Sequence, residues 1–332
     1  MKIVLCYPVD PPQLRQIAEV AANCGLSADI VDAGQERIAT EILAADIYCG
    51  HAKVPVPWDQ VVQQGRLKWI QSSAAGMDHC LVPAVVESKI TVSSASGLLA
   101  NQVTDHTLAL TLGFLRSLPV FFRAQAKREF IRRPTRDLHY AKVGIVGFGG
   151  NGRRLAKVLR EFRCEMFATD CYPQNKPDYV RELLPAERLD EILPSVDIVV
   201  LAAPLTEETR GMFDERRLRL LRPDALLVNM ARGPLVIERD LVKVLKTAHL
   251  AGAVMDVTEV EPLSPESELW DLPNVIITPH VGGQVKSRSE DVTNFFCQNL
   301  PRFARGERLL NQIDKRLGFP LPADALWSQW PV

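Results

Sequence analysis

Short apolar runs alternate with amphipathic stretches along most of the 332-residue chain. In the first third, strand-like runs are separated by segments with helical periodicity, such as residues 12–24. The expected strands are residues 2–7, 28–32, 45–50, 67–73 and 90–95. Because a strand that is apolar on both faces must be covered on both faces, this order predicts a parallel sheet between two layers of helices.

The pattern changes at about Gly97. Residues 98–127 are predicted to form one long, mostly buried helix, in which only Pro119 favours a kink or a break. Six further strands are expected, with helices between them, which is the count of a doubly wound dinucleotide-binding sheet. These strands are residues 142–148, 165–170, 197–203, 225–231, 252–257 and 274–280, and a last helix is expected at about 284–305.

Together these patterns predict an α/β protein with two Rossmann-like or flavodoxin-like parallel-sheet domains and a cleft between them. The last helix is expected to cross back to the first domain. The substrate domain is then discontinuous and consists of residues 1–97 plus 287–332. The NAD-binding Rossmann domain is expected at residues 98–286.

Composition narrows the class of protein. Hydrophobic residues make up 47% of the chain, and 39 lysines and arginines nearly balance 40 aspartates and glutamates, so no nucleic-acid partner is expected. The basic segment 123–136 is interpreted as a solvated arm or a subunit contact. No membrane-span-length run or signal-peptide pattern is present. Seven cysteines without metal-ligand spacing favour a reducing compartment, so we expect a cytoplasmic protein with no membrane partner and no metal site.

A glycine pattern, Gly147-x-Gly149-x-x-Gly152, follows the strand at 142–148 and opens the next helix. In that context the first glycine allows a tight turn, the second lets the backbone approach a pyrophosphate, and the third permits close packing of helix on strand. Asp170 follows at the distance where a carboxylate accepts hydrogen bonds from the adenosine ribose and repels a 2′-phosphate. The sequence therefore predicts NAD as the cofactor, and the nearby cation Lys176 weighs against a strict preference over NADP.

Three charged or titratable residues come at or just beyond the ends of later strands: Arg232, Glu261 and His280. Each alone has a structural interpretation, as a surface ion pair, a solvated loop acid or a satisfied ring. Because they follow a nucleotide-binding motif in the sequence, the three residues together suit hydride exchange with a 2-oxo acid. An arginine fork holds a carboxylate and polarises a carbonyl, and an imidazolium favoured by a nearby carboxylate donates a proton to the oxygen.

From about Ala45 to Arg305 the chain resembles the D-isomer-specific 2-hydroxyacid dehydrogenase family. The resemblance rests on GFGGNG (147–152), APLTEETRGMF (203–213), LLVNMARGPLV (226–236), GAVMDVTEVEPL (252–263) and NVIITPHVGG (274–283). It implies that Arg232 anchors the substrate and that His280 is the acid/base with Glu261 as its partner. It also implies that Asp256 lies by the nicotinamide carboxamide. Further cofactor contacts are expected from Phe148, Gly150, Asn151, Ala203, Pro204, Thr209, Met230, Ala231, Gly282 and Gly283.

Asn151 departs from the aliphatic residue expected before Gly152, which is expected to loosen local packing without removing the phosphate-binding amides. In the segment 71–79, which also resembles the family, small residues would let the backbone N–H groups of Ala75 and Gly76 bind the substrate carboxylate. An ordinary strand-to-helix turn is the alternative there. His106 is interpreted as a buried or interface ring rather than a catalytic one.

The leading interpretation is an NAD-dependent oxidoreductase that interconverts a small D-2-hydroxy acid and its 2-oxo acid, of the glyoxylate/hydroxypyruvate reductase or phosphoglycerate dehydrogenase kind. An alternative is an NAD(H)-binding regulator or corepressor-like protein with the same fold. Formate is disfavoured as a substrate because Glu261 is a carboxylate where formate-using relatives have an amide. A homodimer is expected, because the helix at 98–118 and the basic arm after it offer more apolar surface than one domain covers.

Overall fold

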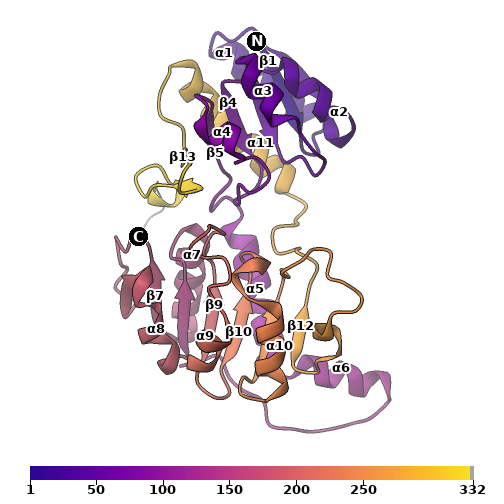
Figure 1. Ribbon diagram of the computed structural model, residues 1–332, viewed down its shortest axis with the longest axis vertical. Helices are drawn as coiled ribbons and strands as arrows, with labels where there is room; N and C mark the ends of the chain where they lie inside the picture. The colour runs from indigo at the N-terminus through magenta and orange to yellow at the C-terminus, as the bar shows by residue number, and fades with distance from the viewer. Residues whose placement is uncertain (330–332) are drawn as a thin grey trace. The chain divides into compact units, whose positions relative to one another are not determined.

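Two separate parallel sheets organise the computed structural model, which describes residues 1–329 (Figure 1). Of the described residues, unit 1 contains Met1–Leu99 together with residues 285–329, and unit 2 contains Ala100–Gln284. Helices cover both faces of each sheet. The predicted α/β class with two parallel sheets is therefore confirmed.

The sheet of unit 1 has five parallel strands in the order β2-β1-β3-β4-β5. Their bounds are β1 Lys2–Cys6, β2 Asp29–Asp32, β3 Ile47–Gly50, β4 Trp69–Ser72 and β5 Thr91–Ser93. Helices α1 (Pro11–Asn23) and α11 (Arg288–Ala304) pack on one face, and α2 (Gly34–Glu41), α3 (Trp58–Gln64) and α4 (Pro83–Glu87) pack on the other. This strand order is the flavodoxin-like one.

Apolar and polar contacts both specify the return of α11 to this sheet. The buried ring of Phe296 stacks on Trp69 with ring centroids 5.0 Å apart. The buried amide of Asn299 donates to Gln71 Oε1 at 3.0 Å, so the polar atoms at this contact are satisfied. Truncating such a buried phenylalanine costs about 3 to 5 kcal/mol, which makes the contact a substantial part of the stability of unit 1.

The sheet of unit 2 has seven parallel strands in the order β12-β11-β10-β9-β6-β7-β8. Their bounds are β6 Lys142–Val146, β7 Glu165–Asp170, β8 Glu182–Pro185, β9 Ile198–Leu201, β10 Leu226–Asn229, β11 Gly252–Met255 and β12 Val275–Ile277. The sequence predicted six strands and missed β8. That strand is short, lies at the edge of the sheet and carries no fully buried side chain, so it lacks the apolar run on which the prediction relied.

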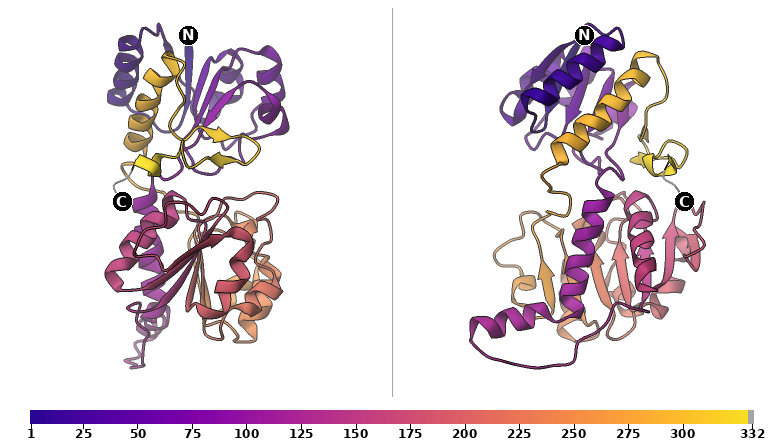
Figure 2. Two further views of the ribbon diagram at one scale, coloured as in Figure 1. Left: turned by 90° about the vertical axis from the view of Figure 1, so that its left-hand side faces the viewer. Right: turned by 180° about the vertical axis from the view of Figure 1, so that it is seen from behind.

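Helices cover both faces of this sheet, as the left view of Figure 2 shows. One face carries α5 (Ala100–Leu115) and α7 (Gly150–Leu159), and the other carries α8 (Leu189–Ile192), α9 (Glu215–Leu220) and α10 (Glu238–Lys246). Successive residues of β9 point alternately into the two cores, because side chains along a strand alternate between its faces.

The segment expected as one helix at 98–127 is two helices, α5 and α6 (Leu118–Ala126), which meet at 66°. Ser117 between them has a left-handed backbone with φ of 56°, and Pro119 lies in the first turn of α6. A proline inside a continuous helix would lack the N–H for its hydrogen bond and would clash with the carbonyl four residues earlier, so the chain starts a new helix instead.

Three further features complete the fold. The tail forms a short antiparallel pair, β13 (Ile313–Asp314) with β14 (Phe319–Pro320), which the sequence did not predict. Five of the seven cysteines are buried as free thiols. Within residues 1–329 no single helix is long and apolar enough to cross a membrane; α5 and α6 pass that test only together, as a bent pair, and only by length and composition.

Candidate active site

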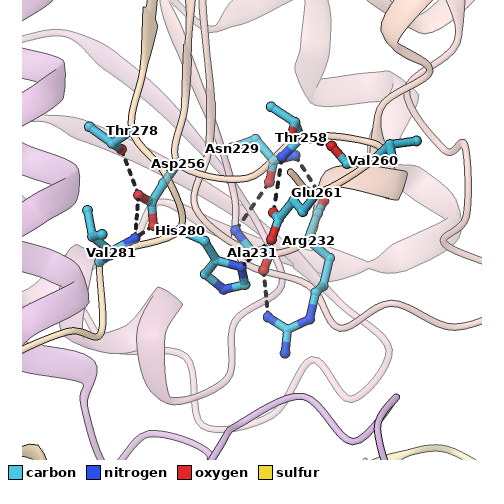
Figure 3. Close-up of polar contacts among 11 residues, drawn as sticks. Asn229, Ala231, Arg232, Asp256, Thr258, Val260, Glu261, Thr278, His280 and Val281 are labelled. Carbon is cyan, nitrogen blue, oxygen red and sulfur yellow. Dashed lines mark hydrogen bonds and ion pairs between the residues drawn. The ribbon is translucent and has the colours of Figure 1, made fainter. Parts of the chain in front are cut away.

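The three predicted catalytic residues follow the ends of three neighbouring strands in unit 2. Arg232 comes three residues after β10, while Glu261 follows β11 and His280 follows β12. Because these strands are parallel neighbours in the sheet, their carboxyl ends lie at the same edge. Figure 3 shows the three side chains gathered there.

Arg232 is held by a buried asparagine that sequence reasoning missed. Asn229, the last residue of β10, donates from its amide to the carbonyl of Arg232 at 2.9 Å and accepts from the N–H of Ala231 at 3.2 Å. The next residue must be Gly233, because a Cβ there would lie 1.7 Å from the carbonyl oxygen of Thr258. The turn that carries Arg232 is therefore fixed by hydrogen bonds on one side and by close backbone packing on the other.

Glu261 is oriented by the loop after β11. Its Oε1 accepts from the backbone N–H of Thr258 at 3.2 Å, and the Thr258 hydroxyl donates to the carbonyl of Val260 at 2.8 Å. Partial burial opposes ionisation of Glu261. The hydrogen bond and charge of His280, the Thr258 N–H and the charge of Arg232 outweigh burial and lower the pKa of the carboxyl below its usual value of 4.5. The site therefore holds Glu261 as a carboxylate.

His280 lies 2.8 Å through Nδ1 from Oε2 of Glu261 (Figure 3). Its backbone is left-handed, with φ of 54°, a conformation that costs a residue with a Cβ about 1 kcal/mol or more. Its N–H donates to the carbonyl of Asp256 at 2.7 Å, which helps hold the turn in this conformation. Such strain, held by surrounding hydrogen bonds, is typical of functional positions.

Asp256 is the residue that organises the turn after β12. Its carboxylate is 3% exposed and accepts from the N–H of Val281 at 3.0 Å and from the N–H of Gly282 at 2.9 Å. The Thr278 hydroxyl donates to the same carboxylate at 2.6 Å. The backbone on both sides of His280 is thereby tied to one buried acid.

The glycine-rich loop has the shape that a dinucleotide needs. Gly147 has φ of 93°, and a Cβ there would lie 2.6 Å from the backbone nitrogen of Ala203. A Cβ on Gly152 would lie 2.2 Å from the carbonyl oxygen of Gly147, whereas a Cβ on Gly149 would meet nothing within 4 Å. Backbone packing thus demands two of the glycines, and the middle one faces open space at the N-terminus of α7, where a pyrophosphate fits.

The acidic residue expected at the end of β7 is tied to this loop. Asp170 accepts from the N–H of Phe148 at 2.6 Å and from the N–H of Tyr172 at 2.8 Å. Arg153, which sequence reasoning did not single out, lies over the Phe148 ring at 4.7 Å and donates to the carbonyls of residues 174 and 175. Lys176 donates to the carbonyl of Val180 at 2.8 Å.

The other expected cofactor contacts are dispersed around the same strand ends. Phe148 and Gly150 are buried, and the N–H of Phe148 already donates to Asp170. The Thr209 hydroxyl donates to the carbonyl of Pro204 at 2.8 Å, which closes the turn after Ala203. Asn151 and Met230 line one small pocket, and a Cβ on Gly282 would lie 3.6 Å from Met230 Cε. Residues 1–329 hold no group of three acidic, histidine or cysteine side chains arranged to bind a metal.

The expected substrate contacts lie in unit 1. Ala75 is exposed and Gly76 is half-buried, in the loop that follows β4. The fold of this loop is set by the Ser72 hydroxyl, which exchanges hydrogen bonds with the backbone of Ala74. Within the described residues, the N–H groups of Ala75 and Gly76 donate to no backbone carbonyl.

Comparison with known families decides the class. The model of the D-isomer specific 2-hydroxyacid dehydrogenase, NAD binding domain, matches residues 108–282, more than half of the chain. The chain belongs to this family. The resemblance expected from the sequence motifs is therefore confirmed.

Individual members of the 2-hydroxyacid dehydrogenase family agree with this assignment. The glyoxylate reductase of Pyrococcus furiosus is 36% identical over 253 residues, which cover 73% of this chain and 74% of that protein. A D-isomer specific 2-hydroxyacid dehydrogenase from Xanthobacter autotrophicus Py2, solved with NADPH and MES, is 28% identical with a TM-score of 0.79, and the match covers 96% of this chain and 99% of that one.

A third relative is the NADPH-dependent glyoxylate/hydroxypyruvate reductase of Sinorhizobium meliloti, solved with NADP and sulfate. It is 25% identical with a TM-score of 0.77, and the match covers 96% of this chain and 99% of that one. These comparisons show an oxidoreductase, a 2-hydroxyacid dehydrogenase with an NAD-binding domain. They give no support to the alternative of a regulator.

Proposed function

We propose that this dehydrogenase reduces a small 2-oxo acid to its D-2-hydroxy acid with NADH, with His280 as the acid/base, Glu261 as its partner and Arg232 as the substrate anchor. The observation that carries the proposal is the 2.8 Å contact between His280 Nδ1 and Glu261 Oε2. A titratable ring fixed by an ionised acid, at the edge of a dinucleotide-binding sheet, is the arrangement that acid-assisted hydride transfer requires.

The contact also assigns the protons. Glu261 is ionised and can only accept, so Nδ1 of His280 carries a hydrogen in both charge states of the ring. The proton that the ring gains and loses is therefore the one on Nε2. When bound, the nicotinamide cofactor supplies the hydride to the carbonyl carbon of the 2-oxo acid. The oxygen takes the Nε2 proton and becomes the hydroxyl, and the neutral ring keeps its hydrogen bond to Glu261.

Arg232 contributes a fixed positive charge beside this pair. Its guanidinium can hold a carboxylate through two N–H groups and polarise the neighbouring carbonyl, whereas the Nη1 of the arginine donates to the carbonyl of Ala231 at 2.8 Å in this structure. For unit 1 by itself, we propose that the N–H groups of Ala75 and Gly76 can bind a substrate carboxylate. Ala75→Pro removes one of these N–H groups and should raise the KM for the substrate. If the loop is only an ordinary turn, the KM should not change.

NAD is the proposed cofactor in preference to NADP. The Asp170 carboxylate is fixed at the end of β7 by two backbone N–H groups, and it can still accept from ribose hydroxyls. Lys176 and Arg153 both donate to backbone carbonyls in this loop. Two relatives with solved structures hold NADPH or NADP. Because the proposed preference rests on the Asp170 carboxylate, and these relatives hold the phosphorylated cofactor, the preference needs a direct test. We expect a tenfold preference for NADH, or about 1.4 kcal/mol.

The test of the function is a substrate panel in the reductive direction. Glyoxylate and hydroxypyruvate, the substrates named for the relatives, are assayed beside bulkier 2-oxo acids, each with NADH and with NADPH. The proposal expects saturable NADH oxidation with at least one small 2-oxo acid and a chiral product of D configuration. An L product, or no turnover with any member of the panel, would contradict it.

Self-association is proposed through a segment of unit 2 that we call the apolar arm, residues 118–131. Figure 1 shows α6 and the chain after it extending from the rest of this unit. Four large apolar side chains are exposed there: Leu118, Phe122, Phe130 and Ile131, with Phe130 at 92%. So much exposed apolar surface within one short segment indicates a protein partner, and we propose that this partner is a second copy of the chain.

The oligomer is tested by sedimentation. The wild-type protein is expected to sediment as a dimer at micromolar concentration, and Phe130→Ser should shift it toward the monomer. Trp270→Ser, which removes an aromatic side chain that is 53% exposed elsewhere in the unit, is the matched control and should remain dimeric. A monomeric wild type would contradict the proposal.

We also propose that the enzyme works in the cytoplasm, because its buried free thiols suit a reducing compartment. Its proposed partners are small 2-hydroxy and 2-oxo acids, with neither nucleic acid nor membrane involved. Labelling of the thiols in intact cells tests this location: thiols found in disulfides would contradict it.

A further inference from the structure

His106, which the sequence predicted to be a buried or interface ring, lies against Asp256, the acid that organises the turn around His280. It is on α5, with its side chain 21% exposed. Its Nε2 is 3.2 Å from Oδ1 of Asp256, a residue 150 positions away in the chain, and 3.1 Å from the hydroxyl oxygen of Thr278. The contacts join a helix on one face of the sheet to the ends of β11 and β12.

The donors and acceptors in this group can be assigned. The Thr278 hydroxyl lies 2.6 Å from Asp256 Oδ1 and gives its hydrogen to the carboxylate. The Thr278 oxygen then faces His106 with lone pairs, as does Oδ1 of Asp256. Two acceptors can share only a donor, so Nε2 of His106 carries a hydrogen and points it between them.

Asp256 transmits this contact to the turn around His280. Its carboxylate holds the N–H groups of Val281 and Gly282, and its carbonyl holds the N–H of His280. The ring of His106 also packs on the turn directly, because a Cβ on Gly282 would lie 3.4 Å from His106 Cδ2. The left-handed backbone of His280 is thus supported from both sides.

We infer that His106 is a positioning residue for the reaction: its Nε2–H fixes the Asp256 carboxylate, and through it the turn that presents His280. The inference rests on the proposed function only for its catalytic consequence, because the support of the turn is a property of the free protein. Without the donor, Asp256 Oδ1 keeps the hydrogen bonds from Thr278 and Val281 but can rotate, and the strained turn relaxes.

Hydrogen exchange of the segment 278–284 tests the support directly and needs no activity. His106→Leu removes the donor with little change of volume, and His106→Gln keeps an N–H near the position of Nε2. The expected result is faster exchange of this segment in His106→Leu, by roughly tenfold as for the loss of one hydrogen bond, and near wild-type exchange in His106→Gln. Thr111→Val is the matched control on α5, since its hydroxyl is buried with no partner among the described residues.

If His106→Leu does not fold, Thr278→Val is the second test variant. It removes the other side-chain hydrogen bond to Oδ1 of Asp256. It should also speed exchange of the segment. If the two side chains act through one oxygen, the effects of the double variant will not add. The inference would be overturned if a folded His106→Leu exchanged this segment at the wild-type rate. If only Thr278→Val folds, a wild-type exchange rate in that variant would overturn it.

Kinetics then separate positioning from general stability. When the oxo acid is reduced, His106→Leu should turn over about 10- to 100-fold more slowly than wild type at saturating substrate, while the KM for the oxo acid stays within about threefold. His106→Gln should restore most of this turnover. A saturated rate that remains at the wild-type value despite faster exchange would overturn the catalytic part. If the wild type reduces no 2-oxo acid, the proposed function fails, and the exchange result still decides whether His106 supports the turn.

Discussion

The charge of Glu261 should set where the reductive activity falls with pH. Glu261→Gln keeps the shape of the side chain, and its amide oxygen can still accept from Nδ1 of His280. The substitution therefore removes the negative charge and leaves the hydrogen bond. Because a neutral amide no longer favours the charged ring, the limb on which reduction is lost should move to lower pH.

The geometry sets the size of this shift. Two unit charges 2.8 Å apart attract by about 1.5 kcal/mol in fully solvated surroundings. The side chains of His280 and Glu261 are 46% and 39% exposed, so the solvated limit applies, and pairs of this exposure contribute about 1 kcal/mol or less. A loss of about 0.5 to 1 kcal/mol moves the limb by about 0.4 to 0.7 pH units.

The assay is kcat/KM for reduction of the best oxo acid against pH, for wild type and variant. The pKa of Glu261 is below 4.5, so this carboxylate keeps its charge above roughly pH 6 and its own titration does not shape the limb. Glu259→Gln is the matched control, because Glu259 is an exposed acid of the same loop that accepts from the N–H of Glu238. A limb that stays in place in Glu261→Gln, or moves equally in Glu259→Gln, would show that the charge of Glu261 does not set the pH at which reduction is lost.

Three other substitutions test the substrate anchor, the choice of cofactor and the close packing beside Arg232. In steady-state kinetics, Arg232→Lys should lower kcat/KM for the oxo acid about 100-fold, or about 2.7 kcal/mol, because an ammonium group cannot form the bidentate contact with a carboxylate. A loss under tenfold would count against the anchor role. Asp170→Ala should narrow the ratio of kcat/KM between NADH and NADPH, and an unchanged ratio would show that the carboxylate does not discriminate. Gly233→Ala should lower the unfolding free energy by about 3 kcal/mol or more in a thermal melt, and a wild-type melting temperature would contradict the close packing on Thr258.

Much of the fold followed from the apolar pattern, because most strands of both sheets are buried on both faces and have no internal alternation. The pattern failed where burial is incomplete. Strand β8 at the sheet edge gave no apolar run, and the apolar pattern continues across the break between α5 and α6, where Pro119 follows a left-handed Ser117. A local backbone conformation of this kind leaves little trace in hydrophobic periodicity.

The candidate site, like the fold, could be predicted from the sequence only in part. Arg232, Glu261 and His280 could be named because each follows a strand, and parallel neighbours bring their carboxyl ends together. The residues that hold them could not be named. Asn229 is the last residue of an otherwise apolar strand, and the pairing of His106 with Asp256 spans 150 residues, so neither has a motif that a linear reading could find.

Single-turnover kinetics of His280→Gln test the proposal that His280 delivers the proton as the oxo acid is reduced. The variant is mixed with NADH and a saturating 2-oxo acid, after a fluorescence titration has shown that it binds NADH as the wild type does. We expect the rate of NADH oxidation to fall by a factor of about 10² to 10⁴, the range expected for loss of a general acid. A rate above about one tenth of the wild-type value, with NADH binding intact, would contradict it.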